Sequence, residues 1–326
     1  MGARRAGTVE SLARASRLML SESDLLELDA RFLSPGALRR PPPIPPRDTT
    51  RSVVILMGVP GAGKSRAAAT LVAEGYERLN RDSLGGTLRG IAKKLDGLLR
   101  EGATKVVLDN TYVTRATRND VVRVAHGHGA AVRCVFFDTP PHEVQINVLL
   151  RMIDRFGKVL EPGELAAALR EDPAALPPSA VQRMTRDLEP SAADEGFATI
   201  EIVPFVRHAP QTSTASARPG IALSLDTLGP SAAAFEVDDA LLRRLRETPP
   251  TAACLLFAWR PGLDEPSRER ARTFAAEIAR ATERIVEIAF CTHPAGPPIC
   301  WCRPPLPGMW LGFARRHGID VVGFVP

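Results

Sequence analysis

The segment between residues 52 and 73 constrains the fold of this chain more than any other part. Its centre reads Gly-Val-Pro-Gly-Ala-Gly-Lys-Ser, from Gly58 to Ser65. The apolar stretch Ser52–Met57 before it is typical of a buried strand, and Arg66–Ala73 after it has helical character. Strand, glycine-rich turn and helix in this order form a phosphate-binding P-loop. The sequence therefore predicts an α/β fold that binds a nucleoside triphosphate; the alternative is a chance match in a glycine turn.

Each residue of this loop has an expected part in binding ATP and Mg²⁺. Backbone N–H groups of the turn can surround phosphate oxygens, and the N-terminus of the following helix adds positive potential. Lys64 should lie between the β- and γ-phosphates, and the Ser65 hydroxyl should hold Mg²⁺. The residues expected to bind the nucleotide are Gly58, Val59, Pro60, Gly61, Ala62, Gly63, Lys64 and Ser65.

The composition is that of an ordinary globular protein, with 44% hydrophobic and 24% charged residues. At 326 residues the chain is long enough for two domains, each with its own core. The net charge of +5 is compatible with a polyanionic substrate but does not argue for one. No apolar run reaches the ~18 residues needed to span a bilayer. Because the five cysteines show no disulfide framework, we expect a cytoplasmic protein.

Shifts in composition divide the chain into four segments. Residues 1–50 combine a helical appendage with a proline-rich linker, and residues 209–219 form a polar linker. Residues 51–208 alternate apolar strands with helices, as a parallel α/β sheet does, and residues 220–326 form a second, smaller α/β unit. Strands are expected at Ser52–Met57, Tyr76–Leu79, Lys105–Leu108, Val132–Phe136, Thr199–Val203, Ile221–Leu225, Ala253–Ala258 and Val286–Phe290, with a helix at Ser267–Ile285.

Two aspartates follow strands of the first domain. Asp82 lies at the carboxyl end of the second strand, the edge of a parallel sheet where ligands bind, and can accept the proton of an attacking hydroxyl. The alternative is that Asp82 caps the helix that follows it. Asp109 ends the strand Val106–Leu108 and suits an aspartate that orients Mg²⁺ or its waters, unless it is only a turn residue.

A predicted helix at residues 144–155 carries two arginines four positions apart, Arg151 and Arg155, and therefore on one face. Phosphoryl transfer needs cations that close over the β- and γ-phosphates during reaction. The alternative is a solvated basic face. Arg183 and Arg186 are weaker candidates for phosphate contacts.

Four short segments of the first domain carry a family resemblance. They are Gly58–Ser65, Leu79–Gly85 (Leu-Asn-Arg-Asp-Ser-Leu-Gly), Val107–Thr111 (Val-Leu-Asp-Asn-Thr) and Asp194–Phe197 (Asp-Glu-Gly-Phe). In order and spacing, over residues 51–208, they resemble the kinase domain of polynucleotide kinase/phosphatases. The resemblance implies ATP-dependent phosphorylation of a 5′-hydroxyl end of DNA or RNA, as in nucleic acid repair. It also implies that Asp82 is the general base.

The same resemblance implies that an arginine of a lid helix reaches the donor phosphates. Arg151 fits this position best, because Asn147 precedes it much as an asparagine does in the family. The family's spacing is one residue shorter, so Arg155 remains the alternative.

The second domain contains a Cys/His cluster with metal-ligand spacing: Cys291, His293, Cys300 and Cys302. Three thiolates and one imidazole make a closed tetrahedral site, which predicts a structural zinc ion. The alternative is buried free cysteines beside a surface histidine. The segment Cys300–Met309 resembles the zinc loop of haloacid-dehalogenase-type phosphatases, in particular the histidinol-phosphate and heptose-bisphosphate group.

This second domain departs from that phosphatase family where the family's chemistry is performed. The Asp-x-Asp nucleophile motif is reduced to Asp226, and the strand Leu255–Trp259 lacks the expected Ser or Thr. Pro304 replaces the lysine, and Phe324 stands where an acidic motif is expected. Without a nucleophile or acidic metal ligands no phosphoaspartate can form. We therefore expect a catalytically inactive remnant kept as a scaffold.

Three functions remain open from the sequence. The first is a polynucleotide 5′-hydroxyl kinase with an inactive phosphatase-like domain. The second is a P-loop kinase of a small molecule such as a nucleoside, sugar or sugar nucleotide. The third is an ATP-binding regulatory or scaffold protein that contacts a protein partner through its C-terminal domain. An aromatic content of 5% weakly disfavours the first, because single strands are commonly held by aromatic stacking.

Overall fold

The computed structural model describes residues 21, 23, 48–207, 219–297 and 299–319. The chain divides into two compact units, residues 1–45 and 46–326, and the features below belong to the second. The expected N-terminal appendage and nearly all of the linker at 209–219 lie outside the described residues. So does Phe324, where an acidic motif was sought.

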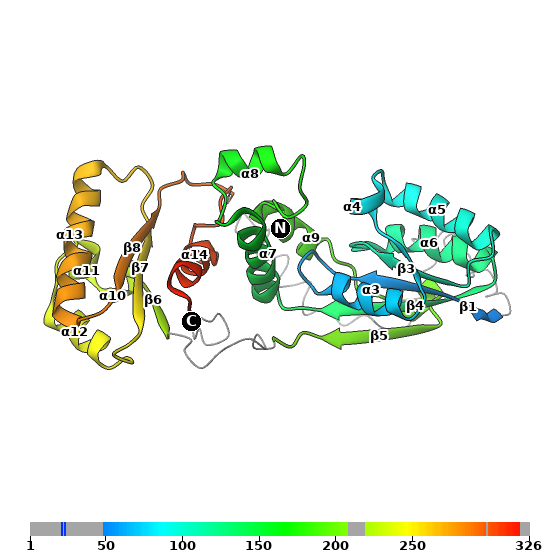
Figure 1. Ribbon diagram of the computed structural model, residues 1–326, viewed down its shortest axis with the longest axis horizontal. Coiled ribbons are helices and arrows are strands. Elements are labelled where there is room, and N and C mark those ends of the chain that lie inside the picture. Colours follow the sequence, from blue (N-terminus) through cyan, green and yellow to red (C-terminus); the bar gives the residue numbers. More distant parts are fainter. Residues whose placement is uncertain (1–20, 22, 24–47, 208–218, 298, 320–326) are drawn as a thin grey trace. The chain divides into compact units, whose positions relative to one another are not determined.

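A five-stranded parallel sheet forms the first half of the second unit (Figure 1). Its strand order is β2-β3-β1-β4-β5, and every neighbouring pair is parallel. The α/β class with a parallel sheet, expected from the sequence, is confirmed. The strands are β1 (Asp48–Met57), β2 (Glu77–Leu79), β3 (Lys105–Asp109), β4 (Ala130–Asp138) and β5 (Thr199–Pro204).

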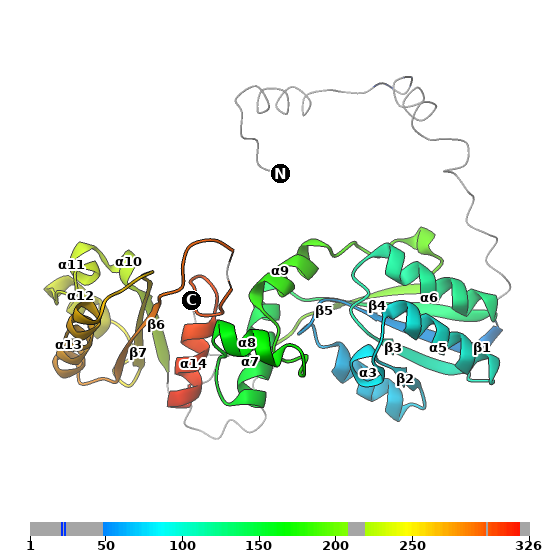
Figure 2. The ribbon, with the colours of Figure 1, turned by 90° about the horizontal axis from the view of Figure 1, so that it is seen from above.

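Helices cover both faces of this sheet. Helices α5 and α6 lie side by side (Figure 2). Leu95 of α5 and Val121 of α6 join one buried cluster with alternate residues of the central strands. Ala68 and Leu71 of α3 join a second cluster on the opposite face. This arrangement explains the continuous apolar strands, since both faces of each central strand are buried. The helices of this half are α3 (Lys64–Ala73), α4 (Arg81–Leu84), α5 (Leu88–Arg100), α6 (Arg115–Gly127), α7 (Pro141–Phe156), α8 (Pro162–Ala168) and α9 (Pro178–Arg186).

The order of the strands sets the place of the loops. The chain leaves β1 for β2 and β3 on one side, and returns to β4 and β5 on the other. In open α/β sheets, ligands bind outside the carboxyl ends of the strands at such a reversal. The P-loop follows β1 and therefore lies at this point.

A second parallel sheet, ordered β6-β7-β8, lies in the C-terminal half. Helices α12 and α13 pack on one face through Leu245 and Phe274, and α14 packs on the other through Phe313 (Figure 1). The elements are β6 (Gly220–Ser224), α10 (Leu225–Leu228), α11 (Pro230–Ala233), α12 (Asp239–Arg246), β7 (Ala253–Trp259), α13 (Glu265–Thr282), β8 (Val286–Cys291) and α14 (Gly308–His317).

Two elements in this half end earlier than expected. The strand expected to include Leu225 stops at Ser224, because Leu225 begins α10. The helix expected to reach Ile285 ends at Thr282, because Glu283 adopts the left-handed conformation that terminates helices (φ 53°).

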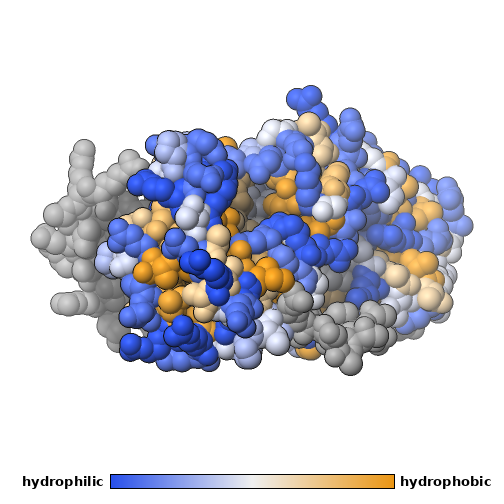
Figure 3. Space-filling model, turned by 60° about the vertical axis from the view of Figure 1, so that its left-hand side comes forward, coloured by the Kyte–Doolittle hydropathy of each residue, from blue (hydrophilic) through white to orange (hydrophobic). Residues whose placement is uncertain are grey.

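Helices α7, α8 and α9 share a buried cluster with Trp301, Leu306 and Leu311, which lie in α14 and in the loop before it. Leu149 of α7, Leu165 of α8 and Val181 of α9 pack in it together with Trp301 and Leu311. On the face shown in Figure 3, hydrophilic residues predominate and apolar residues form small patches between them. Among the described residues, no helix has both the length and the apolar character needed to cross a membrane.

Candidate functional site

The P-loop is built by three glycines and held against α7. Gly58, Gly61 and Gly63 have φ angles of 148°, 84° and 99°, which side-chain-bearing residues rarely adopt. A Cβ atom at Gly61 would lie 3.0 Å from the carbonyl oxygen of Val144. The amide Nδ2 of Asn147 donates a hydrogen bond to the Gly61 carbonyl at 2.8 Å. The loop therefore depends on α7 for its position as well as on its own glycines.

Lys64 is the first residue of α3 and is only 8% exposed. Its Nζ donates to the carbonyl oxygens of Gly58 at 2.9 Å and Val59 at 2.8 Å. Burial lowers the pKa of Lys64 to about 8; nearby Asp109 opposes this shift and Arg151 adds to it. Ser65 is exposed. It lies next to the N-terminus of α3, and it lines the same open cavity as Lys64.

Two asparagines join the ends of β2 and β3, where the two expected aspartates lie. The Asn80 Nδ2 donates to the carbonyl oxygen of Asp109 at 2.6 Å. In return, the Asn110 side chain accepts from the Arg81 backbone N–H at 2.8 Å and donates to the Leu79 carbonyl at 3.2 Å. These contacts explain why the Asn-Arg-Asp and Asp-Asn-Thr segments occur together, since each holds the other in place.

Asp82 is exposed and lines the cavity that Lys64 borders. Its side chain is 51% exposed, with Arg81 at 3.5 Å. The alternative reading of Asp82 as a helix cap is wrong, because Asn80 is the N-cap of α4 and accepts from the Ser83 N–H. The carboxylate of Asp82 is thus left for the cavity.

Asp109 is 2% exposed and takes part in an ion pair that sequence reasoning missed. The guanidinium of Arg78, on β2, donates to its Oδ2 through Nε at 3.1 Å and through a second nitrogen. Asn80 also approaches this Oδ2, at 3.4 Å. Among the described residues, these side-chain contacts all converge on Oδ2.

The two helix arginines have different surroundings. Arg151 lines the cavity and donates to the carbonyl oxygen of Pro173 at 3.2 Å. Arg155 is not part of the cavity lining, and its Nε donates to Asp172 at 2.6 Å. The two arginines that were weaker candidates for phosphate contacts also differ. Arg183 lines the cavity, whereas Arg186 is not a lining residue and lies 3.6 Å from Asp187.

Arg207 is a cavity residue that the sequence did not indicate. It follows β5, and its Nε donates to Glu143 of α7 at 2.8 Å. It also donates to the Asn147 Oδ1 at 3.0 Å, so Asn147 connects Arg207 with the P-loop. Its guanidinium lies 5.3 Å from the centre of the Phe205 ring. A lone arginine after a strand forms no motif, so no sequence signal could have singled it out.

A buried ion pair fixes the loop beside the P-loop. Arg118 is fully buried, and its guanidinium donates to both carboxylate oxygens of Glu195, at 2.7 and 2.9 Å. It also donates to the carbonyl oxygens of Tyr112, Glu189 and Pro190. The loop after β3 in turn accepts a hydrogen bond from the Gly58 N–H, at the Thr111 carbonyl. The Asp-Glu-Gly-Phe segment therefore helps to hold the loop after β3, because its Glu195 pairs with Arg118.

The P-loop borders one open cavity of about 1530 Å³, together with Asp82, Asp109, Arg151 and Arg207. Its lining carries seven basic and four acidic side chains, which favours anionic ligands. The basic residues are Lys64, Arg66, Arg81, Arg151, Arg170, Arg183 and Arg207, and the acidic residues are Asp82, Asp109, Glu171 and Asp172.

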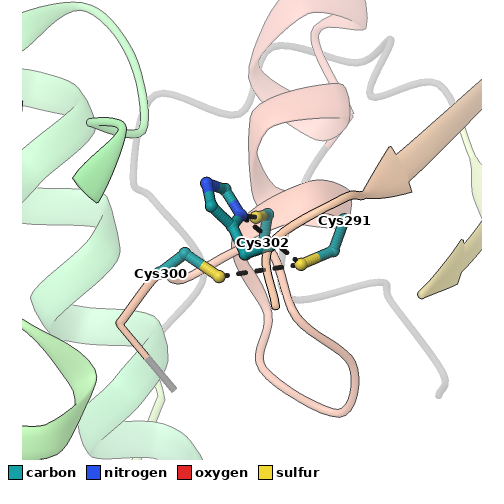
Figure 4. Close-up of side chains that lie close together, drawn as sticks. Cys291, Cys300 and Cys302 are labelled. Atoms are coloured by element: carbon teal, nitrogen blue, oxygen red, sulfur yellow. Dashed lines mark hydrogen bonds between the residues drawn. The ribbon is translucent and has the colours of Figure 1, made fainter. Parts of the chain in front are cut away.

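The Cys/His cluster lies at the end of β8 and in the loop that follows. The three sulfurs converge in Figure 4, with the Cys291 and Cys300 Sγ atoms 3.7 Å apart. The His293 Nδ1 lies 3.6 Å from the Cys291 Sγ and 3.3 Å from the Cys302 Sγ. One ligand atom from each residue lies within 4.8 Å of all the others. Three sulfurs and one imidazole nitrogen are a donor set that suits zinc.

The other ring nitrogen of His293 has a carboxylate partner. Its Nε2 lies 3.3 Å from Glu161 Oε2, just before α8. Metal-bound histidines typically donate their second N–H to such a group, which fixes the tautomer. The geometry therefore fits a site in which Nδ1 binds the metal.

Comparisons with known proteins agree with this reading of the first half. Residues 53–158 match a family model described as an AAA domain. A curated relative is the bifunctional polynucleotide phosphatase/kinase of Schizosaccharomyces pombe, 28% identical over 156 residues, which are 48% of this chain and 34% of that protein. The matched residues 53–158 include the P-loop and the strands β3 and β4 beside it. The match spans about a third of the relative's length, so its complete activity does not carry over directly.

Two solved structures are also similar to the chain. A gluconokinase from Sinorhizobium meliloti 1021 is 18% identical with a TM-score of 0.32, and the match covers 49% of this chain and 86% of that one. Kti12 of Chaetomium thermophilum, in complex with ADP-AlF3, is 12% identical with a TM-score of 0.36, and the match covers 47% and 89%.

Proposed function

We propose that the kinase-type domain transfers the γ-phosphoryl group of ATP to a 5′-hydroxyl end of DNA or RNA. The observation that carries this proposal is the place of Asp82, whose exposed carboxylate shares one cavity with Lys64, Ser65 and Arg151. A carboxylate beside a P-loop can take a proton from an attacking hydroxyl, whereas nucleotide binding alone needs none.

The reaction follows from the roles of these side chains. The P-loop N–H groups and Lys64 bind the β- and γ-phosphates, while Asp82 accepts the proton of the acceptor hydroxyl. The hydroxyl oxygen bonds to the γ-phosphorus, the bond to the β–γ bridging oxygen breaks, and ADP leaves. Arg151 neutralises charge on the transferred group. Ser65 and Asp109 would hold Mg²⁺, which when bound would further neutralise the β- and γ-phosphates.

The acceptor is inferred from the charge of the cavity and from the relative. The excess of basic lining side chains favours a polyanion, and Arg183 extends the basic surface along α9. The similar protein from Schizosaccharomyces pombe is by its name a polynucleotide kinase. A neutral sugar or nucleoside acceptor would not need so many cations, which makes the small-molecule reading the weaker one.

An end-labelling experiment tests this proposal. The full chain is incubated with Mg²⁺ and γ-labelled ATP, and with a 5′-hydroxyl oligonucleotide or a panel of nucleosides, sugars and sugar nucleotides. We expect label on the 5′-hydroxyl oligonucleotide and none on the same oligonucleotide with a 5′-phosphate. Asp82→Asn should lower the signal by about 10²- to 10⁴-fold. Asp120→Asn, on α6 and paired with Arg123, is the matched control. If only a small molecule were labelled, the proposal that a polynucleotide 5′-hydroxyl is the acceptor would be refuted. ATP binding without transfer to any acceptor would favour the scaffold reading.

We further infer that Cys291, His293, Cys300 and Cys302 hold one structural zinc ion. The four donors close the tetrahedral site, so no position remains for a reacting water. We expect no phosphatase activity from this half of the chain. The one aspartate left of the expected nucleophile pair, Asp226, lies in α10 with its Oδ1 2.6 Å from an Arg260 nitrogen.

A further inference from the structure

Trp301 connects the Cys/His cluster with the wall of the kinase cavity. It stands between Cys300 and Cys302, is fully buried, and donates from its indole Nε1 to the carbonyl oxygen of Leu176 at 2.8 Å. Leu176 itself lines the cavity, just before α9. A shift of the cysteine loop therefore moves a residue of the cavity wall.

The backbone around Trp301 leaves little room for such a shift to be absorbed. The Gly308 N–H donates to the Trp301 carbonyl at 3.0 Å, and a Cβ at Gly308 would lie 2.5 Å from that oxygen. The indole ring packs in the buried cluster that contains Val148 and Met152 of α7. Asn147 and Arg151, their sequence neighbours on α7, belong to the cavity lining. Helix α7 thus lies between the cavity and the loop.

His293 supplies a second connection. Its Nδ1 faces the thiols, 3.3 Å from the Cys302 Sγ, and its Nε2 faces Glu161 at 3.3 Å. Glu161 precedes α8, the helix between α7 and α9. A metal on Nδ1 fixes the ring, and the ring then fixes the start of α8.

We propose that the zinc loop, residues 291–297 and 299–302, positions the helices α7, α8 and α9 around the kinase cavity, so that metal loading and triphosphate binding strengthen each other. Trp301 and Glu161 are the positioning residues. This inference rests on the proposed function, because it takes ATP as the ligand of the cavity and zinc as the metal. The physical reason is that Arg151 on α7 and Arg183 on α9 line the cavity, so the placement of these helices sets how closely the two cations approach a bound triphosphate.

Thermodynamic reciprocity gives the test two readouts that do not depend on the acceptor. If zinc tightens ATP binding by some factor, ATP must tighten zinc binding by the same factor. The affinity of Mg·ATP is measured by calorimetry for zinc-loaded and chelator-stripped full chain. The affinity for zinc is measured by competition with a chromophoric chelator, with and without Mg·ATP. We expect both factors to be about fivefold or more and equal within error.

Two variants locate the connection. Glu161→Gln should weaken zinc binding by about 10- to 100-fold, as removal of a histidine's carboxylate partner does at other metal sites. Glu269→Gln is the matched control, since Glu269 lies on α13, is 68% exposed, pairs with Arg272 and should leave zinc affinity unchanged. Trp301→Phe keeps an aromatic ring but loses the hydrogen bond to Leu176. It should retain one zinc per chain, weaken the binding of Mg·ATP, and reduce the coupling factor.

Each result has a defined meaning. Equal ATP affinity with and without zinc, in a protein that binds both, would overturn the inference while leaving the proposed function intact. Unchanged coupling in both Glu161→Gln and Trp301→Phe would also overturn it. Protein that binds no zinc would overturn the metal site and this inference together. Protein that binds zinc but no ATP would overturn the proposed function itself.

Discussion

Lys64 should take up a proton when the triphosphate binds. In the free protein its Nζ is buried and hydrogen-bonded to two carbonyl oxygens, and its pKa is about 8. Asp109 and Asp82 raise this pKa, whereas Arg151 lowers it. The phosphates of a bound triphosphate add several negative charges beside the amine, which favours the ammonium form. Binding should therefore restore the charge that burial suppresses.

The expected uptake follows from the fraction of Lys64 that is neutral before binding. With a pKa of about 8, this fraction is about 0.1 at pH 7, about 0.5 at pH 8 and about 0.9 at pH 9. If bound Lys64 stays charged, the uptake per ATP should equal these fractions. Because the protein with protonated Lys64 binds ATP more tightly, ATP affinity should fall as pH rises above about 8, by up to about tenfold per pH unit.

Calorimetry in several buffers with different ionisation enthalpies measures this uptake, because the apparent binding enthalpy changes in proportion to the protons exchanged. Lys64→Arg is the control, since a guanidinium keeps the charge but does not titrate in this range. Subtraction of its uptake also removes the contribution of ATP's own ionisation. If wild type and Lys64→Arg took up the same number of protons at pH 8 and pH 9, the reasoning about a desolvated lysine would be refuted.

Three further outcomes are expected. Asp82→Asn should keep ATP affinity within a few-fold while phosphoryl transfer falls by about 10²- to 10⁴-fold, the usual contribution of a general base. A collapse of ATP affinity in equilibrium binding measurements would contradict this role. Arg118→Met leaves the buried Glu195 carboxylate unpaired and should lower the free energy of unfolding by about 3–5 kcal/mol in chemical denaturation. Adding Glu195→Gln should recover part of this loss. If it recovered none, the assignment of a stabilising Arg118–Glu195 ion pair would be contradicted. Elemental analysis should find one zinc per chain, and 3′-phosphate ends should not be hydrolysed; magnesium-dependent phosphate release that survives Asp226→Asn would reveal another nucleophile.

Local sequence patterns predicted the parts of the fold that depend on neighbouring residues. The apolar runs identified the strands to within a few residues, because both faces of β1, β3 and β4 are buried. The glycines of the P-loop were recognisable since their positive φ angles exclude other residues. The helix end at Glu283 was missed, because a left-handed cap at a non-glycine residue has no clear sequence signal.

The site was only partly accessible in this way. Asp82 and Lys64 could be named from their place after strands, and the structure puts both beside one cavity. The family resemblance favoured Arg151 but left Arg155 open, because helical spacing puts both on one face and says nothing of their partners. The structure separates them through contacts with residues far along the chain, Pro173 and Asp172.

The sequence by itself determined the class of fold, the phosphate-binding loop and the donor set of the Cys/His cluster, because each depends on residues only a few positions apart. The tertiary structure alone decided which distant groups meet: Arg118 with Glu195 across 77 positions, Arg207 with Glu143 across 64, and Trp301 with Leu176 across 125. A hydrogen bond or ion pair between such residues leaves no periodicity or spacing in the chain. Its partners are selected when packing brings two surfaces together and buries charges that only each other can satisfy.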